Sequence, residues 1–446
     1  MNSILLYFTD LYIIAESLRM LGKLVKSPPN LLKKVGTYMM YGGMNAVLGF
    51  LLLPVLTRYL SPSDFGHVSI FTVSVMFISM LTRLEVQAAL KRQYHQISDE
   101  AFKELLDSSF SLILLMFSGF TLFYALTYTA YLDFFGVPKE WFFAVLFLGL
   151  TGGVSTIVVS FLSIKDEASA VGKWQFISTL ANYGLVLWFV VGLEFGWQGR
   201  IWPLIVVGLA QLVASAIIFR IKIGYRWRFG LNKCTSLLKY SLPLVPHSLG
   251  AYALMSMDRY FLSELLGMDA TGIYATSAQI SFALVLVYSS FMPTWEAWVF
   301  RNLGQDVRRH SKKAVWGILG FLSFFLILIF MFAEAAKIVL PLVLGKDFME
   351  VSSYILLVSL VVFGRASYYL FTPLINLTEK TKVMSYTTVV VVLCNLIGNY
   401  YFINHMGIGG AAIATTVSYF IGTLVLVIYV EKNLRLFSIS FGSRKG

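Results

Sequence analysis

Three arginines, Arg83, Arg259 and Arg365, interrupt stretches of the chain that are otherwise almost free of charge. Arg365 is the deepest of them, because it lies 15 residues after Glu350 and 14 residues before Glu379. A guanidinium is always charged, and its planar fork matches the oxygens of phosphate or carboxylate groups. We therefore predict that Arg365 and Arg259 bind an anion, with Arg83 as a weaker contact. The alternative for Arg365 is a buried ion pair that locks the surrounding helices.

Three carboxylates in the same stretches, Asp258, Glu296 and Glu85, are candidates for ion coupling. A buried carboxylate could take up a proton, and a compact cage of oxygens could hold sodium. Asp258 and Arg259 are adjacent, so on a helix their side chains point about 100° apart and each needs its own partner.

Each of these charges also has a structural alternative. Asp258 could form a salt bridge within its own group of helices, and Arg83 and Glu85 are shallow enough to reach the membrane surface. Glu296 lies between Trp295 and Trp298, and tryptophans are typical of the interfacial belt of a membrane protein. These alternatives predict no contact with a transported molecule.

The charges stand out because the rest of the chain consists of long apolar runs. Residues 383–430 contain no Asp, Glu, Lys or Arg, and the whole chain is 58% hydrophobic and 13% charged. A helix needs about 20 apolar residues to cross a bilayer core, at about 1.5 Å per residue. The sequence therefore predicts an all-α polytopic membrane protein with about twelve transmembrane helices. We place them near residues 36–57, 65–90, 108–132, 141–164, 174–193, 201–219, 240–263, 271–300, 314–333, 351–378, 383–403 and 408–430.

Basic residues are unevenly distributed over the gaps between these spans. With the N-terminus in the cytoplasm, 27 of the 35 Lys and Arg fall in cytoplasmic segments, five on the opposite side and three inside spans. Such a bias is the positive-inside pattern of membrane proteins. We predict cytoplasmic N- and C-termini, and we interpret the net charge of +12 as topology rather than as nucleic-acid binding.

The longest basic gap divides the spans six and six, which predicts two lobes related as a parallel repeat. The first and seventh spans also end alike, at residues 57–60 and 258–261, and a turn containing Asp and Gly follows each. We expect a cytoplasmic-face amphipathic helix and tail over 1–34 (the helix at 3–26), an N-terminal lobe over 35–219, a basic cytoplasmic linker over 220–239, a C-terminal lobe over 240–430 and a cytoplasmic tail over 431–446. Two facing lobes of this kind are typical of alternating-access transporters.

Metal and disulfide chemistry are not predicted. Cys234 and Cys394 lie at different depths and should not pair, and the five histidines are too scattered to suggest a metal site. No cofactor is expected, and a proton or sodium gradient could supply the energy for transport.

The run LPVLTRYLSPSDFG at residues 53–66 resembles the exit of the first span in the polysaccharide transporters of the multidrug/oligosaccharidyl-lipid/polysaccharide exporter superfamily. The seventh span, with YSLPLVPHS at 240–248 and the pair Asp258-Arg259, is similar to that of Wzx-type O-antigen flippases. The resemblance continues in register over residues 36–430, including the division into six and six spans.

The resemblance implies a flippase of lipopolysaccharide and polysaccharide biosynthesis in the bacterial inner membrane. Its substrate would be an undecaprenyl-pyrophosphate-linked oligosaccharide, carried from the cytoplasmic to the periplasmic leaflet. A polysaccharide polymerase and a chain-length regulator would be its partners, together with membrane lipids. In such a flippase, Arg365, Arg259 and Arg83 would hold the anionic head group, and Tyr368 and Tyr369 could stack on sugar rings.

Three other functions remain as alternatives. A multidrug exporter of the same superfamily would share the fold, but its cationic substrates favour acidic cavities, and the deepest charge here is an arginine. A membrane polymerase or glycosyltransferase would need a large extramembrane loop, and the longest outer gap is only about 333–350. A major-facilitator transporter would carry a Gly- and Arg-rich loop after its second span, which residues 89–95 do not match. We therefore expect a transporter and no enzymatic activity.

Overall fold

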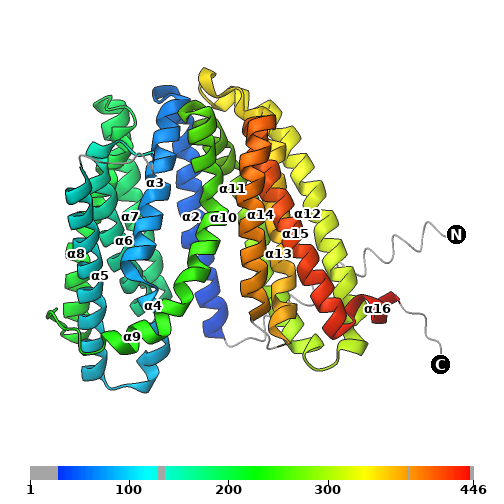
Figure 1. The fold of residues 1–446 in the computed structure, drawn as a ribbon, viewed down its shortest axis with the longest axis horizontal. Coiled ribbons are helices and arrows are strands. Elements are labelled where there is room, and N and C mark those ends of the chain that lie inside the picture. Colours follow the sequence, from blue (N-terminus) through cyan, green and yellow to red (C-terminus); the bar gives the residue numbers. More distant parts are fainter. Residues whose placement is uncertain (1–28, 129–135, 379–381, 442–446) are drawn as a thin grey trace.

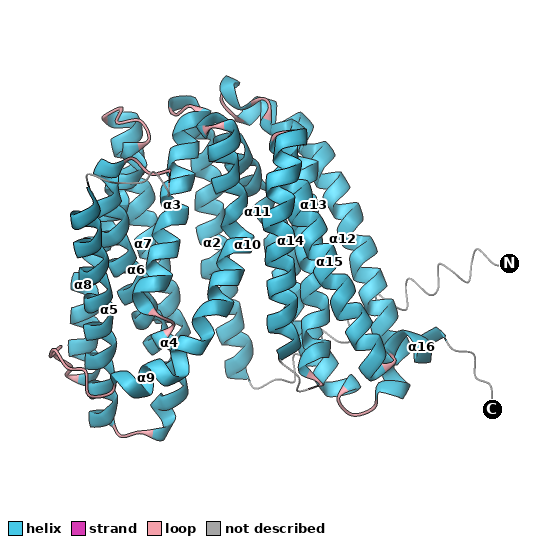
Figure 2. Ribbon diagram, in the orientation of Figure 1, coloured by secondary structure: helices cyan, strands magenta, loops and turns pink. Residues whose placement is uncertain are grey.

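The computed structural model describes residues 29–128, 136–378 and 382–441 of the 446-residue chain, so the amphipathic helix expected at 3–26 lies outside the described residues. The described residues form helices and turns without any strand (Figure 2). The predicted all-α class is confirmed.

The N-terminal lobe is built around α6 (Lys139–Ile164), which packs against four other long helices. These are α3 (Pro62–Arg83), α5 (Asp99–Thr127), α7 (Ala168–Leu187) and α8 (Gln198–Ile223). Helix α2 (Pro29–Tyr59) covers α7, which a π-helical turn (Trp188–Gly192) extends. The short helix α4 (Val86–Gln93) and a 3₁₀ turn (Tyr94–Gln96) connect α3 to α5.

The C-terminal lobe is built around α13 (Val351–Asn376), which packs against α11 (Met268–Trp298), α12 (Val307–Val343) and α15 (Ile408–Leu434). Helix α14 (Lys382–Met406) packs between α15 and α10 (Val245–Leu266), and α16 (Leu436–Phe441) ends the described chain. A π-helical turn (Val299–Leu303) follows α11, and a 3₁₀ turn (Lys346–Phe348) precedes α13. Figure 1 shows the two lobes side by side, with α5 and α8 at one edge and α12 at the other.

Eleven of the described helices are long and apolar enough to cross a membrane. Helix α10 corresponds to the seventh predicted span, which is not among these eleven, and its 22 residues rise about 33 Å. It is more polar than the other eleven because it carries Asp258, Arg259 and Glu264. The chain is therefore a multi-pass membrane protein, and the twelve long helices of its described residues form two lobes of six.

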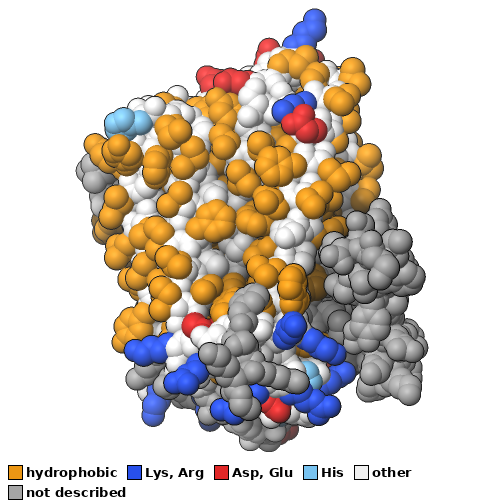
Figure 3. Space-filling view, turned by 90° about the vertical axis from the view of Figure 1, so that its right-hand side faces the viewer, with side chains coloured by type: hydrophobic (Ala, Val, Ile, Leu, Met, Phe, Trp, Pro, Cys, Tyr) orange, Lys and Arg blue, Asp and Glu red, His pale blue; other side chains and the backbone are white. Residues whose placement is uncertain are grey.

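Hydrophobic side chains cover the side of the C-terminal lobe, whereas Lys and Arg gather at one end of the molecule (Figure 3). We call this the basic end; α4 and α9 (Cys234–Ser241) lie there (Figure 1). A broad apolar band above a basic rim is the surface expected of a protein that crosses a bilayer.

The second predicted span, near 65–90, is found as α3, but it ends at Arg83, and the residues after Glu85 form the separate helix α4. Leu84 and Glu85 both have left-handed backbone conformations, with φ of 46° and 58°, and they separate α3 from α4. Left-handed residues other than glycine cost about 1–2 kcal/mol each. Glu85 contacts Arg83 and Gln87 from this position.

The start of α3 follows from its first residues. Ser61 accepts a hydrogen bond from the backbone N–H of Asp64 (3.1 Å), and Asp64 accepts one from the backbone N–H of Ser61 (2.9 Å). This capping box provides acceptors for backbone N–H groups that have no partner within the helix at its N-terminus, and Pro62 occupies the first helical position. The Asp–Gly segment predicted as a turn at 64–66 therefore forms the first turn of a helix.

Two glycines bring the lobes into backbone contact at the end opposite the basic end. A Cβ atom on Gly66 of α3 would lie 2.1 Å from the carbonyl oxygen of Met268. One on Gly272 of α11 would lie 1.8 Å from the carbonyl oxygen of Pro62. The contact is reciprocal. Each glycine lies four residues after the first residue of its own helix, and it faces the carbonyl of the first residue of the other helix. We call it the α3–α11 glycine contact, and no larger residue would permit it.

A second contact closes the same end beside the first. The backbone N–H of Gly345 donates to Oγ1 of Thr57 (3.1 Å), which joins the end of α2 to the segment after α12. The rings of Phe65 and Phe348 pack edge to face with centroids 5.0 Å apart. The lobes are therefore held together at this end by backbone, hydroxyl and aromatic contacts.

We predict that Gly272→Ala separates the lobes at this end, because the added methyl group would collide with backbone that cannot move aside. Spin labels on Tyr59→Cys and Asp269→Cys, two exposed positions on opposite lobes, would report the change as a longer mean distance. Gly320→Ala in α12 is the control, since a Cβ there meets nothing within 4 Å. An unchanged distance in the Gly272→Ala protein would contradict the assigned role.

Candidate functional site

Arg365 lies on α13, half-buried in the C-terminal lobe, without a carboxylate partner. Its Nη2 lies 3.8 Å from Sδ of Met255 on α10, and its Cζ lies 5.8 Å from the ring centroid of Tyr369. Tyr288 and Tyr419 also interact with it electrostatically. Its Nε is buried and has no hydrogen-bond partner among the described residues. The ion pairs found in the described chain do not include Arg365, so the predicted alternative of a locking ion pair is not what the structure holds.

Asp258 is buried in α10 and is satisfied by hydrogen bonds. Its Oδ2 accepts from the hydroxyl of Tyr274 on α11 (2.5 Å), and its Oδ1 accepts from the backbone N–H of Arg259 (2.8 Å). Tyr274 is itself only 2% exposed. The buried Nε of Arg259 has no hydrogen-bond partner within the described chain. This carboxylate is therefore oriented by a tyrosine, and the arginine beside it keeps its hydrogen-bonding capacity.

Arg259 and Arg365 approach the same face of α10. Residues four apart on a helix lie on one face, so Met255 and Arg259 are one turn, about 6 Å, apart along α10. Arg365 contacts Met255 from α13. The C-terminal lobe thus places one arginine on α10 and a second against the neighbouring turn of α10, and the Nε of each has no hydrogen-bond partner among the described residues.

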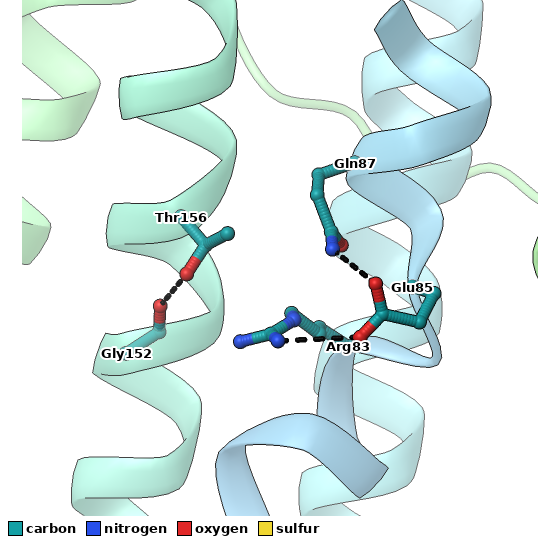
Figure 4. A network of polar contacts seen from close by, with 5 residues as sticks. All are labelled: Arg83, Glu85, Gln87, Gly152 and Thr156. Carbon is teal, nitrogen blue, oxygen red and sulfur yellow. Dashed lines mark hydrogen bonds and ion pairs between the residues drawn. The ribbon is translucent and has the colours of Figure 1, made fainter. Parts of the chain in front are cut away.

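Arg83 belongs to a separate cluster in the N-terminal lobe. Its Nη2 lies 3.3 Å from Oε1 of Glu85, and Nε2 of Gln87 donates to the other carboxylate oxygen (2.6 Å). Figure 4 shows the guanidinium reaching from the α3–α4 break toward α6 at Gly152 and Thr156. The Thr156 hydroxyl is engaged, since it donates to the carbonyl of Gly152 (2.8 Å). Arg83 is therefore neutralised by Glu85 instead of being extended to the membrane surface.

The remaining predicted residues are not assembled into one site. Tyr369 lies beside Arg365 and is 37% exposed, whereas Tyr368 is buried and packs against Tyr419 (centroids 6.0 Å apart). Glu296 is exposed on α11 and lacks the burial that we require of a coupling carboxylate. In the described part of the chain, no group of three or more His, Cys, Asp and Glu side chains is placed to hold a metal.

Sequence reasoning missed two features. Arg200 is one of the five basic residues that fall between spans on the side opposite the cytoplasm, since it lies just before the predicted span at 201–219. In the structure it lies in the first turn of α8, with its Cζ 5.2 Å from the ring centroid of Phe65. Side-chain hydrogen bonds in the C-terminal lobe form the second feature. Nδ2 of Asn399 donates to Oδ1 of Asn395 (3.0 Å), and Nδ2 of Asn395 donates to Oγ1 of Thr415 (2.9 Å). A search for charge inside the spans passes over this uncharged cluster. Asn395 and Asn399 lie four residues apart within the charge-free run 383–430, and this spacing could have revealed the cluster.

The model of a family described as "Polysaccharide biosynthesis protein" matches residues 31–295, which is more than half of the chain. This chain belongs to the polysaccharide biosynthesis protein family. The recognition made from the first and seventh spans is confirmed.

Two of the curated relatives of this chain have names that state a function. It is 25% identical over 302 residues to the succinoglycan biosynthesis transport protein ExoT of Rhizobium meliloti, covering 64% of this chain and 54% of ExoT. It is 25% identical over 263 residues to a probable low-salt glycan biosynthesis flippase of Haloferax volcanii, covering 53% and 52%. It thus spans about half the length of these two relatives. An uncharacterized membrane protein of Haemophilus influenzae is 22% identical over 358 residues, covering 76% and 82%.

Solved structures agree on the fold. The structure of this family member is similar to the lipid II flippase MurJ in an inward closed conformation, with a TM-score of 0.73 at 15% identity over 90% of this chain and 89% of MurJ. An inward-facing multidrug resistance MATE family transporter of the MOP superfamily matches with a TM-score of 0.61 at 14% identity, covering 88% and 96%. At these identities the likeness shows the fold alone, and it confirms the predicted two-lobe architecture.

We predict that Arg83 and Glu85 are energetically coupled in this family member by about 1–3 kcal/mol, because a partly buried charge that loses its partner stays uncompensated. Unfolding free energies in detergent of Arg83→Gln, Glu85→Gln and the double variant would measure this coupling. The exposed ion pair of Lys337 and Glu334 (2.6 Å) is the matched control, with an expected coupling below about 0.5 kcal/mol. Equal coupling in the two cycles would contradict the prediction.

Proposed function

We propose that this protein is a flippase for undecaprenyl-pyrophosphate-linked oligosaccharide repeat units of the O-antigen type. It would carry them from the cytoplasmic to the periplasmic leaflet of a bacterial inner membrane. Membership of the polysaccharide biosynthesis family supports the substrate class. The names of two relatives, a succinoglycan transport protein and a glycan flippase, support transport instead of catalysis.

The observation that carries this proposal is the unpaired guanidinium of Arg365 inside the C-terminal lobe. A charge at membrane depth costs several kcal/mol unless it meets a partner or water. The described residues around Arg365 supply a thioether and tyrosine rings but no carboxylate. An anionic head group is the partner that these surroundings lack, and a pyrophosphate can accept the forked hydrogen bonds of both Arg365 and Arg259.

Alternating access would proceed by breaking the α3–α11 glycine contact. The basic end would face the cytoplasm by the positive-inside rule, with both termini on that side. The glycine contact then closes the periplasmic end, and release of the substrate requires it to open. A proton or sodium gradient could drive this step through Asp258, which is the most buried of the three coupling candidates.

The head group would meet the arginines in sequence. Arg83 lies nearer the basic end than Arg365 and would exchange Glu85 for the arriving pyrophosphate. Tyr369 is exposed beside Arg365 and could stack on a sugar ring, whereas the buried Tyr368 would support it. A polysaccharide polymerase and a chain-length regulator would take up the product on the periplasmic side.

A multidrug exporter remains the second candidate by fold, because MATE transporters match this structure. Cationic drugs would require acidic groups in place of Arg259 on α10 and Arg365 on α13. The charge of this site therefore favours an anionic substrate.

We expect Arg365→Ala to lower the flipping rate at least about tenfold, because truncating one partner of a buried charged pair costs about 2–5 kcal/mol. Arg365→Lys should recover part of the activity, since it keeps the charge but loses the fork. Arg308→Ala is the control, because Arg308 is an exposed basic residue at the start of α12. Full activity of a folded Arg365→Ala protein would remove Arg365 from the site.

The function itself is tested by depleting the protein in its native bacterium and treating spheroplasts with an impermeant sugar-modifying reagent. The proposal predicts lipid-linked repeat units that accumulate on the cytoplasmic side, protected from the reagent, with loss of surface glycan. Accumulation on the outer face would indicate a polymerase. Normal surface glycan, in a strain without a redundant flippase, would favour the drug exporter.

A further inference from the structure

A pocket of about 470 Å³ lies in the N-terminal lobe, away from the C-terminal lobe. Helices α5 and α8 form its walls and α6 its floor, and its apolar lining includes Ile113, Val154 and Phe219. Both wall helices pack on α6, and they form the edge of the molecule farthest from α12 (Figure 1). We call this cavity the α5–α8 pocket.

The rim of the pocket is a fixed structure made by the linker after α8. Gly224, with φ of 62°, ends α8 and turns the chain back toward α5. The Tyr225 hydroxyl donates to Asp107 (2.7 Å), and the backbone N–H of Gly230 donates to Ser111 (3.0 Å). Burial, and then the hydrogen bond to Asp107, raise the pKa of Tyr225, so this hydroxyl stays protonated and keeps donating. The linker residues 225–227 are thereby held over the pocket.

The pocket is bordered by surface of the kind that faces lipid. Val213 and Ile217 on α8 are 62% and 51% exposed, and Leu115 on α5 is 44% exposed. Trp227 on the rim is 48% exposed, and tryptophan is typical of the level of lipid head groups. The pocket is thus reached from the bilayer side, with its rim at the basic end.

Two arginines on the rim have no ion-pair partner among the described residues. Arg220 and Arg226 both line the pocket and are exposed. The neighbouring carboxylates are engaged: Asp107 with Tyr225, and Glu167 with Lys222 at 2.6 Å. The rim therefore carries two arginines without an ion-pair partner at the mouth of an apolar cavity, beside the hydrogen-bonded carboxylate of Asp107.

We propose that the α5–α8 pocket binds one acyl chain of an anionic phospholipid, whose phosphate is held by Arg220 and Arg226. A methylene group takes up about the volume of a water molecule, about 30 Å³, so the cavity matches a single chain of about sixteen carbons. A polyprenyl chain several times longer does not fit it. The pocket lies on the N-terminal lobe and apart from Arg259 and Arg365, so this inference does not depend on the proposed transport function.

The test is lipid binding to the purified full-length protein by native mass spectrometry. Phosphatidylglycerol should bind more tightly than phosphatidylcholine with the same acyl chains. The variant Arg220→Gln/Arg226→Gln should weaken phosphatidylglycerol binding about tenfold or more, because each basic group near an anionic lipid contributes about 1 kcal/mol. Ala216→Phe, which fills the pocket from α8, should weaken the binding of phosphatidylglycerol by a similar factor.

Matched controls separate this site from general effects. Arg308→Gln/Arg309→Gln removes two exposed charges from the basic end of the other lobe, and Ala210→Phe adds the same ring to an exposed position of α8 outside the pocket. Both should bind phosphatidylglycerol like the unmodified protein. Equal affinity for the two phospholipids, or equal loss in the Arg308→Gln/Arg309→Gln control, would overturn the proposal. Tighter binding of undecaprenyl phosphate than of phosphatidylglycerol, lost in Arg220→Gln/Arg226→Gln, would assign the pocket to the transport substrate instead.

Discussion

The α3–α11 glycine contact is the constraint on which the arrangement of the two lobes depends. Gly66 and Gly272 each admit the first carbonyl of the opposite helix, so the helices meet backbone to backbone. The close approach also brings Phe65 against Phe348 and Thr57 against Gly345. Apart from one hydrogen bond, these are van der Waals contacts, and no ion pair locks them. A contact built in this way is specific in shape but can separate without leaving buried charges behind.

The two lobes treat their internal charges differently. In the N-terminal lobe, Arg83 is neutralised by Glu85, and two left-handed residues bring that carboxylate into place. In the C-terminal lobe, Asp258 is held by Tyr274 and Arg365 by a thioether and aromatic rings. The difference therefore involves the backbone break between α3 and α4 as well as the side chains. The C-terminal lobe therefore retains cationic hydrogen-bonding capacity at membrane depth, and this is the chemistry that an anionic ligand requires.

The twelve spans and the division into lobes could be predicted because apolar length and the absence of charge are properties of the sequence itself. The same pattern also identified Arg83, Arg259 and Arg365 as arginines inside the spans. Their partners could not be predicted, because Tyr274 and Met255 meet these groups through helix packing and not through sequence spacing. The break at Leu84 and Glu85 carries no glycine or proline signal, so a continuous helix was the natural expectation. Arg200 lies within α8 instead of before it, because α8 begins earlier than its apolar run.

The covalent connection between the lobes belongs structurally to the N-terminal lobe. After the linker residues bound to α5, helix α9 packs on α4 and α5, with Leu237 fully buried and the Arg92 guanidinium 4.6 Å from the ring centroid of Tyr240. Only the 3₁₀ turn at Leu242–Leu244 then separates this packed segment from α10. Pro243 and Pro246 lack the N–H groups that would continue a regular helix through this point. A change in the angle between the lobes would therefore concentrate at this turn, while the α5–α8 pocket and its rim would stay with the N-terminal lobe.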